Sequence, residues 1–449
     1  MVLTGRAALI ALLCVLPIAV APAPGVAFVA LFGALVLAIV ADIALAASPR
    51  RLQVTRSGDT AARLGQSVDS VLDVRNPVRR RIRGSLRDAW PPSAHGAPRT
   101  HELDVPAGQR VTLRTSLRPT RRGDLRSALV TARSIGPLGL AGRQASHRVS
   151  GQIRVLPPFL SRKHLPSRLA RLRELDGSTP ALIRGQGTEF DSLREYVVGD
   201  DVRSIDWRAT ARRADVVVRT WRPERDQRIV IVLDTGRTSA GRVGVDPTAA
   251  RSPAPPAAQH PGGWPRLDWS MDAALLLAAL AARAGDHVDF LAHDRVTRAG
   301  VFNASRSELL AQLVSAMAPL QPALVESDPA AMASAIQRRV RRRALVVLLT
   351  DLNASALEEG LITVLPRLAA RHHVLIAAVT DPRVDLLAAG RDDAAAVYDA
   401  AAAERSRNDR NRIAGTLRQA GVDVVDAPPE ELAPALADRY LHMKATGRL

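Results

Sequence analysis

The sequence predicts an α/β protein in which a doubly wound, mostly parallel sheet follows a small β-sandwich and an N-terminal transmembrane helical hairpin. Three observations predict this fold class. Two apolar runs open the chain, short segments of alternating polarity follow, and the second half alternates apolar strands with helix-length segments. We expect boundaries at 1–49 for the helical hairpin, 50–157 for the sandwich, 158–227 for a connecting core segment and 228–449 for the α/β domain.

The helical hairpin is predicted from the apolar runs Ala7 to Ala21 and Val26 to Ala47. The second run is long enough to cross a bilayer, which takes about 20 residues, and Asp42 is its one charge. A cleaved signal peptide is the alternative for the first run, because small residues at 19–21 suit a cleavage site. The second run would still hold the protein in the membrane.

Charges at the ends of the helical hairpin predict its orientation. Arg6 precedes it, Arg50, Arg51 and Arg56 follow it, and no charge lies in its turn. The positive-inside rule then places both ends, and with them the large C-terminal part, in the cytoplasm of a multi-pass membrane protein. Asp42 lies near the end of the second run, so we expect it at the membrane interface.

Period-two alternation between Asn-Pro, Pro-Pro, Arg-Gly and Gly-Pro turns predicts the sandwich. A basic cluster at residues 79–83 would lie near anionic membrane lipid if the orientation above holds. A solvated turn explains the same cluster, and the sequence does not separate the two interpretations. The expected strands are Ser67–Val74, Arg110–Leu117, Ala128–Ala132 and Gln152–Leu156.

Short β-branched runs between helix-length segments predict the α/β domain. A basic linker helix, Leu160–Asp176, precedes it, and a Pro-, Gly- and Ala-rich insertion, Gly241–Pro265, follows its first strand. The expected strands are Ile229–Leu233, His287–Ala292, Ala344–Thr350, Val374–Thr380 and Val422–Val425, with an antiparallel edge strand at Val296–Phe302. The expected helices are Trp269–Arg283, Ser307–Ala318, Pro329–Arg339, Ala354–Ala370, Ala394–Ala420 and Glu430–Met443.

The core segment alternates acids and arginines with single aromatic residues and contains no Cys or His between residues 184 and 213. This composition favours a fixed network of ion pairs, in which Arg203 and Arg208 separate the carboxylates. We expect Trp207 to be buried and to anchor the segment against the α/β domain. The positions that carry the pattern are Arg184, Gly185, Gly187, Glu189, Phe190, Arg194, Tyr196, Gly199, Asp200, Asp201, Arg203, Asp206, Trp207 and Arg212.

The spacing of these residues resembles the core of the bacterial family called domain of unknown function 58. The likeness covers roughly the C-terminal two-thirds of the chain. It implies that the α/β domain is von Willebrand factor type A-like, with a Rossmann-like sheet. It also implies that the protein works beside a separate MoxR-type AAA+ ATPase in the assembly or maturation of other proteins.

Carboxylates at strand ends form the candidate binding site, since apolar strands run into Asp234, Asp294, Asp351 and Asp381. Open α/β sheets bind ligands outside the carboxyl ends of their strands. Asp234 and Asp351 become neighbours there if the first and fourth strands adjoin. Two close carboxylates favour Mg²⁺ or another divalent cation, or an arginine such as Arg237, between them. For Asp294 and Asp381 we expect caps of the following helices.

The resemblance assigns this place to a metal site with the motif Asp-x-Ser-x-Ser, completed by a distant Thr and a later Asp. Here Asp234 is followed by Gly236, which offers no hydroxyl, and by Thr238, which does. Asp351 matches the later acid, while no motif places the distant Thr. The expected metal ligands are therefore Asp234, Thr238 and Asp351 in a degenerate site, and the sequence leaves open whether the site still binds a cation.

Composition and motifs argue against several classes of function. The net charge of +18 invites a nucleic-acid partner, but aromatic residues make up only 3% of the chain, too few for base stacking. The single cysteine, Cys14, excludes an intramolecular disulfide. Gly236 stands where a haloacid-dehalogenase phosphatase needs its second Asp, and the sequence has no P-loop, no Gly-x-Ser-x-Gly and no His-Glu-x-x-His.

These observations favour a membrane-anchored, non-enzymatic binding or scaffold protein. The alternative is a divalent-metal-dependent hydrolase at the membrane surface, in which Asp200, Asp201 and Asp206 would hold the metal. The ion-pair interpretation of these three acids competes with that alternative, because arginines lie among them.

Overall fold

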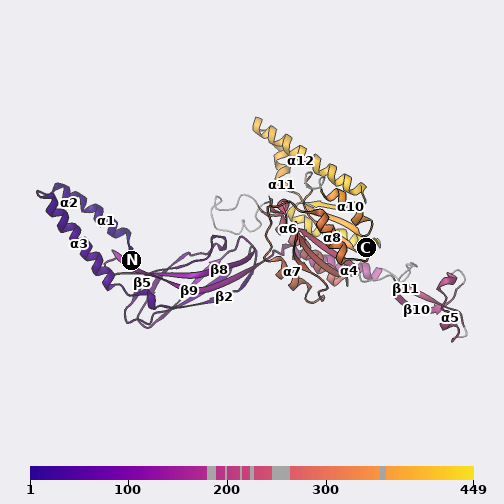
Figure 1. Cartoon of the computed structure of the whole chain (residues 1–449), viewed down its shortest axis with the longest axis horizontal. Coiled ribbons are helices and arrows are strands. Elements are labelled where there is room, and N and C mark those ends of the chain that lie inside the picture. The colour runs from indigo at the N-terminus through magenta and orange to yellow at the C-terminus, as the bar shows by residue number, and fades with distance from the viewer. Residues whose placement is uncertain (179–188, 198–199, 213–214, 223–226, 245–262, 354–359) are drawn as a thin grey trace. The chain divides into compact units, whose positions relative to one another are not determined.

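The structure is a computed structural model of the chain, and it describes residues 1–178, 189–197, 200–212, 215–222, 227–244, 263–353 and 360–449. The described residues divide into two compact units, Met1–Leu156 and Pro157–Leu449. The chain combines helices and sheets in a mixed α/β architecture (Figure 1).

Apolar helices open the first unit. α3 (Pro24–Leu45) returns alongside α1 (Gly5–Leu13) and α2 (Val15–Val20) (Figure 1). Ala7 packs against Leu35. The helix that begins with α3 is long and apolar enough to cross a membrane, with a mean hydropathy of 2.7, and only 11% of its apolar window is buried. The helix over α1 and α2 is apolar but shorter, so the described residues contain one helix of spanning length where the sequence predicted two.

Two sheets in the first unit enclose one core. Leu72 of one sheet packs with Ile82, Leu86 and Val130 of the other. The first sheet has the order β2 (Gln53–Gly58), β4 (Val68–Arg75), β7 (Arg110–Leu117). The second has the order β1 (Val2–Leu3), β9 (Ala141–Leu156), β8 (Gly123–Ile135), β5 (Ile82–Asp88), β6 (Thr100–Val105), with β3 (Ala61–Arg63) beside β9. The four expected strands correspond to β4, β7 and parts of β8 and β9, whereas β2, β3, β5 and β6 were missed.

The second unit contains a six-stranded sheet with the order β16 (Thr297–Val301), β15 (His287–His293), β12 (Arg228–Asp234), β17 (Leu345–Leu349), β18 (His373–Val379), β19 (Asp423–Ala427). Every pair is parallel except β15–β16. The antiparallel edge strand expected at Val296–Phe302 is thereby confirmed, as is the adjacency of the first and fourth strands.

Helices pack against this sheet through alternate residues of its strands. Val230, Val346 and Ile376 share a core with Ile336 and Leu365. Residues of opposite parity point to the other face, where the buried helix α6 and helix α13 contact the strands. The helices are α4 (Leu165–Ser178) with the 3-10 turn η3 (Leu160–His164) before it, α6 (Arg266–Arg283), α7 (Leu309–Met317), α8 (Pro329–Arg339), α10 (Ile362–Ala369), α11 (Pro382–Ala389), α12 (Ala394–Gln419) and α13 (Pro429–Ala445).

Some expected elements lie partly outside the described residues. The helix expected at Ala354–Ala370 is α10 from Ile362 onward, because 354–359 are not described. Of the insertion Gly241–Pro265, residues 245–262 are not described, and its ends pair as the short strands β13 (Arg242–Val243) and β14 (Trp264–Pro265).

The core segment contains two antiparallel strands, β10 (Glu189–Glu195) and β11 (Val217–Arg222). Between them lie the 3-10 turn η4 (Val202–Ser204) and the short helix α5 (Trp207–Thr210). Asp200, Asp201 and Asp206 therefore lie between two paired strands, on turns that they help to close.

Candidate functional site

The candidate site lies at the carboxyl ends of β12 and β17, which are hydrogen-bonded parallel neighbours. Asp234 ends β12, and Asp351 follows β17 by two residues. Both carboxylates line one cavity of about 790 Å³, together with Thr238, Ser327 and Thr350. Parallel pairing thus brings the two predicted acids to the same edge of the sheet.

Hydroxyl groups surround the Asp234 carboxylate. Ser327 Oγ donates to Asp234 Oδ1 at 2.6 Å, Thr350 Oγ1 donates to Oδ2 at 2.8 Å, and Thr238 Oγ1 donates to Oδ2 at 3.3 Å. The Gly236 backbone N–H also donates to Oδ1, at 2.8 Å. Three hydroxyls from three separate segments therefore converge on one half-buried carboxylate.

Ser327 occupies the space of the side chain that Gly236 lacks. A Cβ added at Gly236 would lie 2.1 Å from Ser327 Oγ and 3.2 Å from Asp234 Oδ1. The Ser327 hydroxyl therefore stands where a serine at position 236 would have begun its side chain. Sequence reasoning missed Ser327, although one signal was available: Asp328 and Pro329 directly after it form a helix start, with Asp328 accepting the Ala331 N–H.

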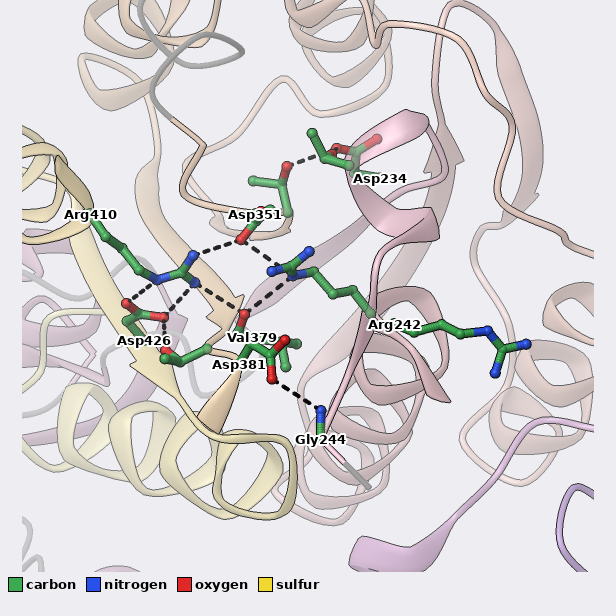
Figure 2. Close-up of polar contacts among 12 residues, drawn as sticks. Asp234, Arg242, Gly244, Asp351, Val379, Asp381, Arg410 and Asp426 are labelled. Atoms are coloured by element: carbon green, nitrogen blue, oxygen red, sulfur yellow. Dashed lines mark hydrogen bonds and ion pairs between the residues drawn. The ribbon is translucent and has the colours of Figure 1, made fainter. Parts of the chain in front are cut away.

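The Asp351 carboxylate is held by arginines. Arg410 Nη1 contacts Asp351 Oδ1 at 2.8 Å (Figure 2). Arg266 Nε lies 3.5 Å from the same oxygen. Arg410 also donates to Asp426, at 2.6 and 2.7 Å, and to the Val379 carbonyl at 3.2 Å. Burial alone would lower the pKa of Arg410, but the hydrogen bond to Asp426 and the charge of Asp351 raise it above its ordinary value.

The neutralisation of Asp351 differs from what the sequence led us to expect. The sequence predicted that either a cation or Arg237 would lie between Asp234 and Asp351 and neutralise them. Arg237 instead pairs with Glu326, and its place is taken by Arg410 from α12 and Arg266 from α6. These residues are remote in sequence and reach the edge of the sheet only through the packing of their helices.

The other two strand-end acids have local roles. Asp381 caps α11 by accepting the Arg383 N–H at 3.1 Å, as expected, and also accepts from the Gly244 N–H at 3.4 Å (Figure 2). Asp294 was expected to cap a helix, which is wrong because β16 follows it. Its carboxylate closes the β15–β16 turn through the Arg295 N–H at 2.6 Å and pairs with Arg298 Nε at 2.6 Å.

The three acids of the core segment are each engaged separately. Asp200 pairs with Arg194 at 2.5 Å and accepts the Val197 N–H. Asp201 caps η4. Asp206 caps α5 and pairs with Arg219 at 2.7 Å, and this hydrogen bond from Arg219 is the main reason that the pKa of Asp206 is lowered.

The ion-pair network of the core segment forms with other arginines than expected. Its cations are Arg194 and Arg219. Within the described residues, no ion pair involves the side chain of Arg203 or Arg208. Trp207 is 67% exposed, so the expectation of a buried anchor is wrong. As the first residue of a four-residue helix, it has few neighbours to bury it.

The remaining positions of the pattern lie in or beside β10, on the surface or outside the described residues. Tyr196 pairs through its backbone with the carbonyl of Val216 at 2.8 Å, and Arg212 is exposed. Glu189 and Phe190 begin β10. The positions Arg184, Gly185, Gly187 and Gly199 lie outside the described residues.

The donor set at Asp234 fits a hard cation. One carboxylate with neighbouring hydroxyl oxygens suits Mg²⁺, which keeps several waters and needs few protein ligands. Within the described ranges, no three His, Cys, Asp or Glu side chains are grouped to hold a metal, so a site there must rely on hydroxyls. Thr238, Ser327 and Thr350 supply them.

Comparisons with known proteins agree with the spacing of the core segment. Residues 192–248 and 265–418 match the family described as "Protein of unknown function DUF58". The chain is also 28% identical over 211 residues to "Uncharacterized protein Mb1516" of Mycobacterium bovis and to "Uncharacterized protein Rv1480" of Mycobacterium tuberculosis. These alignments cover 46% of this chain and 60% of each relative, so the chain spans 60% of the length of the curated relatives it matches. The part of the chain that holds Asp234, Ser327, Asp351 and Arg410 is therefore similar to the family of unknown function 58, as the resemblance predicted.

Proposed function

We propose that this protein is a membrane-anchored, non-enzymatic binding protein that holds a divalent cation, Mg²⁺ in the first place, at Asp234. The observation that carries the proposal is the ring of hydroxyls from Thr238, Ser327 and Thr350 around one carboxylate, at the edge of a parallel sheet and inside a cavity. Ligands of open α/β sheets bind at this edge.

The proposed class of the α/β unit is von Willebrand factor type A-like and doubly wound. The strand order supports it, because the sheet starts in the middle at β12, grows outward on both sides and ends in an antiparallel edge strand, β16. The occurrence of helices against strand residues of both parities supports the doubly wound part of the proposal.

Charge at the site indicates the kind of group that it would bind. Arg410 and Arg266 neutralise Asp351, whereas among the described residues no arginine or lysine forms an ion pair with Asp234 in the hydroxyl ring. A divalent cation on a single carboxylate retains positive charge and attracts a further anionic oxygen. A carboxylate on a partner protein would supply that oxygen.

The proposed partner is a MoxR-type AAA+ ATPase on a separate polypeptide, with client proteins whose assembly or maturation the pair supports. The resemblance of the core segment supports this choice. The exposed Trp207 between the paired strands β10 and β11 offers an aromatic contact for such a partner.

The proposed anchor is a helical hairpin with both ends in the cytoplasm. The exposed apolar surface of α3 supports membrane insertion. The contacts of its two ends support the hairpin, because Thr4 before α1 and Asp42 near the end of α3 bind the same turn. Thr4 Oγ1 donates to the Gly139 carbonyl at 2.7 Å, and Asp42 Oδ2 accepts the Leu140 N–H at 2.8 Å.

The alternative of a metal-dependent hydrolase has less support. Asp200, Asp201 and Asp206 would have to release their caps and ion pairs before they could share a metal. We therefore keep the binding function as the proposal.

Thermal unfolding of the full-length protein in detergent tests the cation site. We expect millimolar Mg²⁺ or Mn²⁺ to raise the melting temperature relative to EDTA, because a ligand of the folded state stabilises it by about 2.7 kcal/mol at 100 times its Kd. Asp234→Asn should abolish this shift. Asp381→Asn is the matched control, since it alters a strand-end acid that caps α11. A wild-type protein that does not respond to either cation would refute the site.

A further inference from the structure

The end of α3 is fixed to the β-unit by a buried carboxylate. Asp42 is fully buried, and its oxygens accept the backbone N–H groups of Leu138 at 2.8 Å, Leu140 at 2.8 Å and Ala141 at 2.9 Å. The position of Asp42 at the membrane interface stays a prediction, and its carboxylate holds the turn between β8 and β9. A Cβ at Gly136 would lie 2.2 Å from Asp42 Oδ1, so the close approach requires glycine there. These contacts therefore fix the position of the β8–β9 turn relative to the end of α3.

Arginines surround this junction. We call Arg6, Arg50, Arg51, Arg80 and Arg143 the arginine collar. Arg143 Nε donates to the Ile43 carbonyl at 2.9 Å, and Arg80 Nη1 donates to the Leu45 carbonyl at 3.4 Å. These contacts satisfy carbonyls at the end of α3, where positive charge is favourable.

The other three arginines of the collar lie beside the same junction of α3 with the β8–β9 turn. Arg50 and Arg51 form the turn η1 (Pro49–Arg51) directly after α3, and both are exposed. Arg6 lies over the β8–β9 turn, since a Cβ at Gly139 would be 2.9 Å from Arg6 Nη1. Among the described residues, no carboxylate forms an ion pair with any of the five collar arginines.

Apolar side chains complete the surface. In and beside the β8–β9 turn, Leu138 is 53% exposed and Ile135 is 40% exposed. They lie beside the end of a helix whose own apolar side chains are exposed, for example Leu37 and Val40. Arginines with exposed apolar residues at the end of an apolar helix match a bilayer surface, where anionic headgroups lie above acyl chains.

We propose that the arginine collar binds the headgroups of anionic membrane lipids, with Leu138 and Ile135 inserted beside α3. This inference rests on the proposed membrane anchoring of α3. It also resolves the basic cluster at 79–83, which the sequence left open. Arg81 and Arg83 both face Asp104, at 2.5 and 3.9 Å, while Arg80 turns to the end of α3. Only part of that cluster therefore belongs to the lipid surface.

Lipid retention by the full-length protein tests the proposal. The protein in nonionic detergent is mixed with phosphatidylglycerol or phosphatidylcholine, and bound lipid is counted by native mass spectrometry. We expect preferential retention of phosphatidylglycerol, weakened roughly fivefold or more by Arg50→Gln/Arg51→Gln. Arg81→Gln/Arg83→Gln is the matched control, because it removes the same charge from residues already paired with Asp104. The control should retain phosphatidylglycerol as the wild type does.

Three results would overturn the proposal. If the wild type retains the two lipids equally, the collar has no preference for anionic headgroups. If both double variants lose phosphatidylglycerol to the same extent, retention depends on the net charge of the protein and not on the collar. If inorganic phosphate stabilises the protein against thermal unfolding as much as phosphatidylglycerol does, the collar is a site for free anions. Carbonate extraction of native membranes separates the two proposals: a protein that stays in the membrane but lacks lipid preference refutes the collar alone, whereas a released protein refutes the anchoring as well.

Discussion

Next to Asp234, the loop after β12 has no hydroxyl at Gly236, and Ser327 from another loop supplies one. Gly236 has an ordinary φ of −76°, so the backbone conformation there would accept any residue. The constraint comes mainly from Ser327 Oγ, 2.1 Å from an added Cβ, with the Val325 carbonyl oxygen at 3.0 Å as a lesser contact. The site thus retains its oxygen atoms while the motif in the sequence is incomplete.

Substitution at Gly236 tests this exchange. Gly236→Ser should collide with Ser327 Oγ and lower the free energy of unfolding by about 1–3 kcal/mol, as overpacking does. The double variant Gly236→Ser/Ser327→Gly returns the hydroxyl to the first loop and should recover both the stability and the response to Mg²⁺. Denaturant unfolding of both variants measures this. A single variant as stable as the wild type would show that the two side chains do not compete.

The residues at this edge differ in how far the sequence reveals them. Asp234 and Thr238 follow an apolar strand at fixed spacing, and both contribute to the ring. Ser327 and Arg410 come from a loop and a helix that no local pattern links to the strand ends. Their positions depend on how α8 and α12 pack, which is decided by contacts far apart in sequence. The exposure of a side chain also depends on contacts between residues far apart in sequence, and for that reason the predicted burial of Trp207 was wrong.

At the scale of elements, α6 carries a buried acid through the core of the second unit. Asp272 accepts the Ser161 N–H at 3.1 Å and so fastens η3 to α6. Burial raises the pKa of Asp272 to about 6, although the hydrogen bonds from Ser161 oppose the shift. Between the unfolded pKa and about pH 6 the folded protein keeps a proton that the unfolded chain has lost, so stability falls as the pH rises through this window.

Asp272→Asn removes this pH dependence while it keeps an oxygen that accepts from Ser161. We expect the variant to be more stable than the wild type at pH 7, by about 2–3 kcal/mol, and similar to it at pH 4. Denaturant unfolding at the two pH values checks this, with the exposed Asp385→Asn as the control. A variant that is less stable at pH 7 would mean that the ionised carboxylate binds Ser161 more strongly than burial disfavours it.

The strands that are buried on both faces were all predicted, whereas among the strands buried on one face β4 and β7 were predicted and others were missed. The strands of the parallel sheet are continuous apolar runs, such as Leu345–Leu349, and these were found. The strands β5 and β6 were missed, since arginines, acids and a glycine alternate with their few buried residues. Such strands are stabilised by pairing with neighbours that the local sequence does not reveal.

At the scale of the whole molecule, the orientation of the proposed helical hairpin can be tested by fusions. A reporter fused after Leu449 should be active in the cytoplasm, and one inserted at Gly25, in the first turn of α3, should face the other side. The reason is the arginine collar, because the positive-inside rule places a concentration of arginines at the cytoplasmic end of apolar helices. A C-terminal fusion active on the outer side of the membrane would reverse the proposed orientation.

The fastening of Asp42 also has a mechanical meaning. β9 runs over 16 residues from Ala141 to Leu156, roughly 50 Å at about 3.3 Å per residue. One end receives the Asp42 carboxylate at Ala141, and the other end is the last residue of the first unit. Tension applied at Leu156 would therefore pass into the β8–β9 ladder, which runs to the end of α3 and is fastened there by the three N–H groups on Asp42.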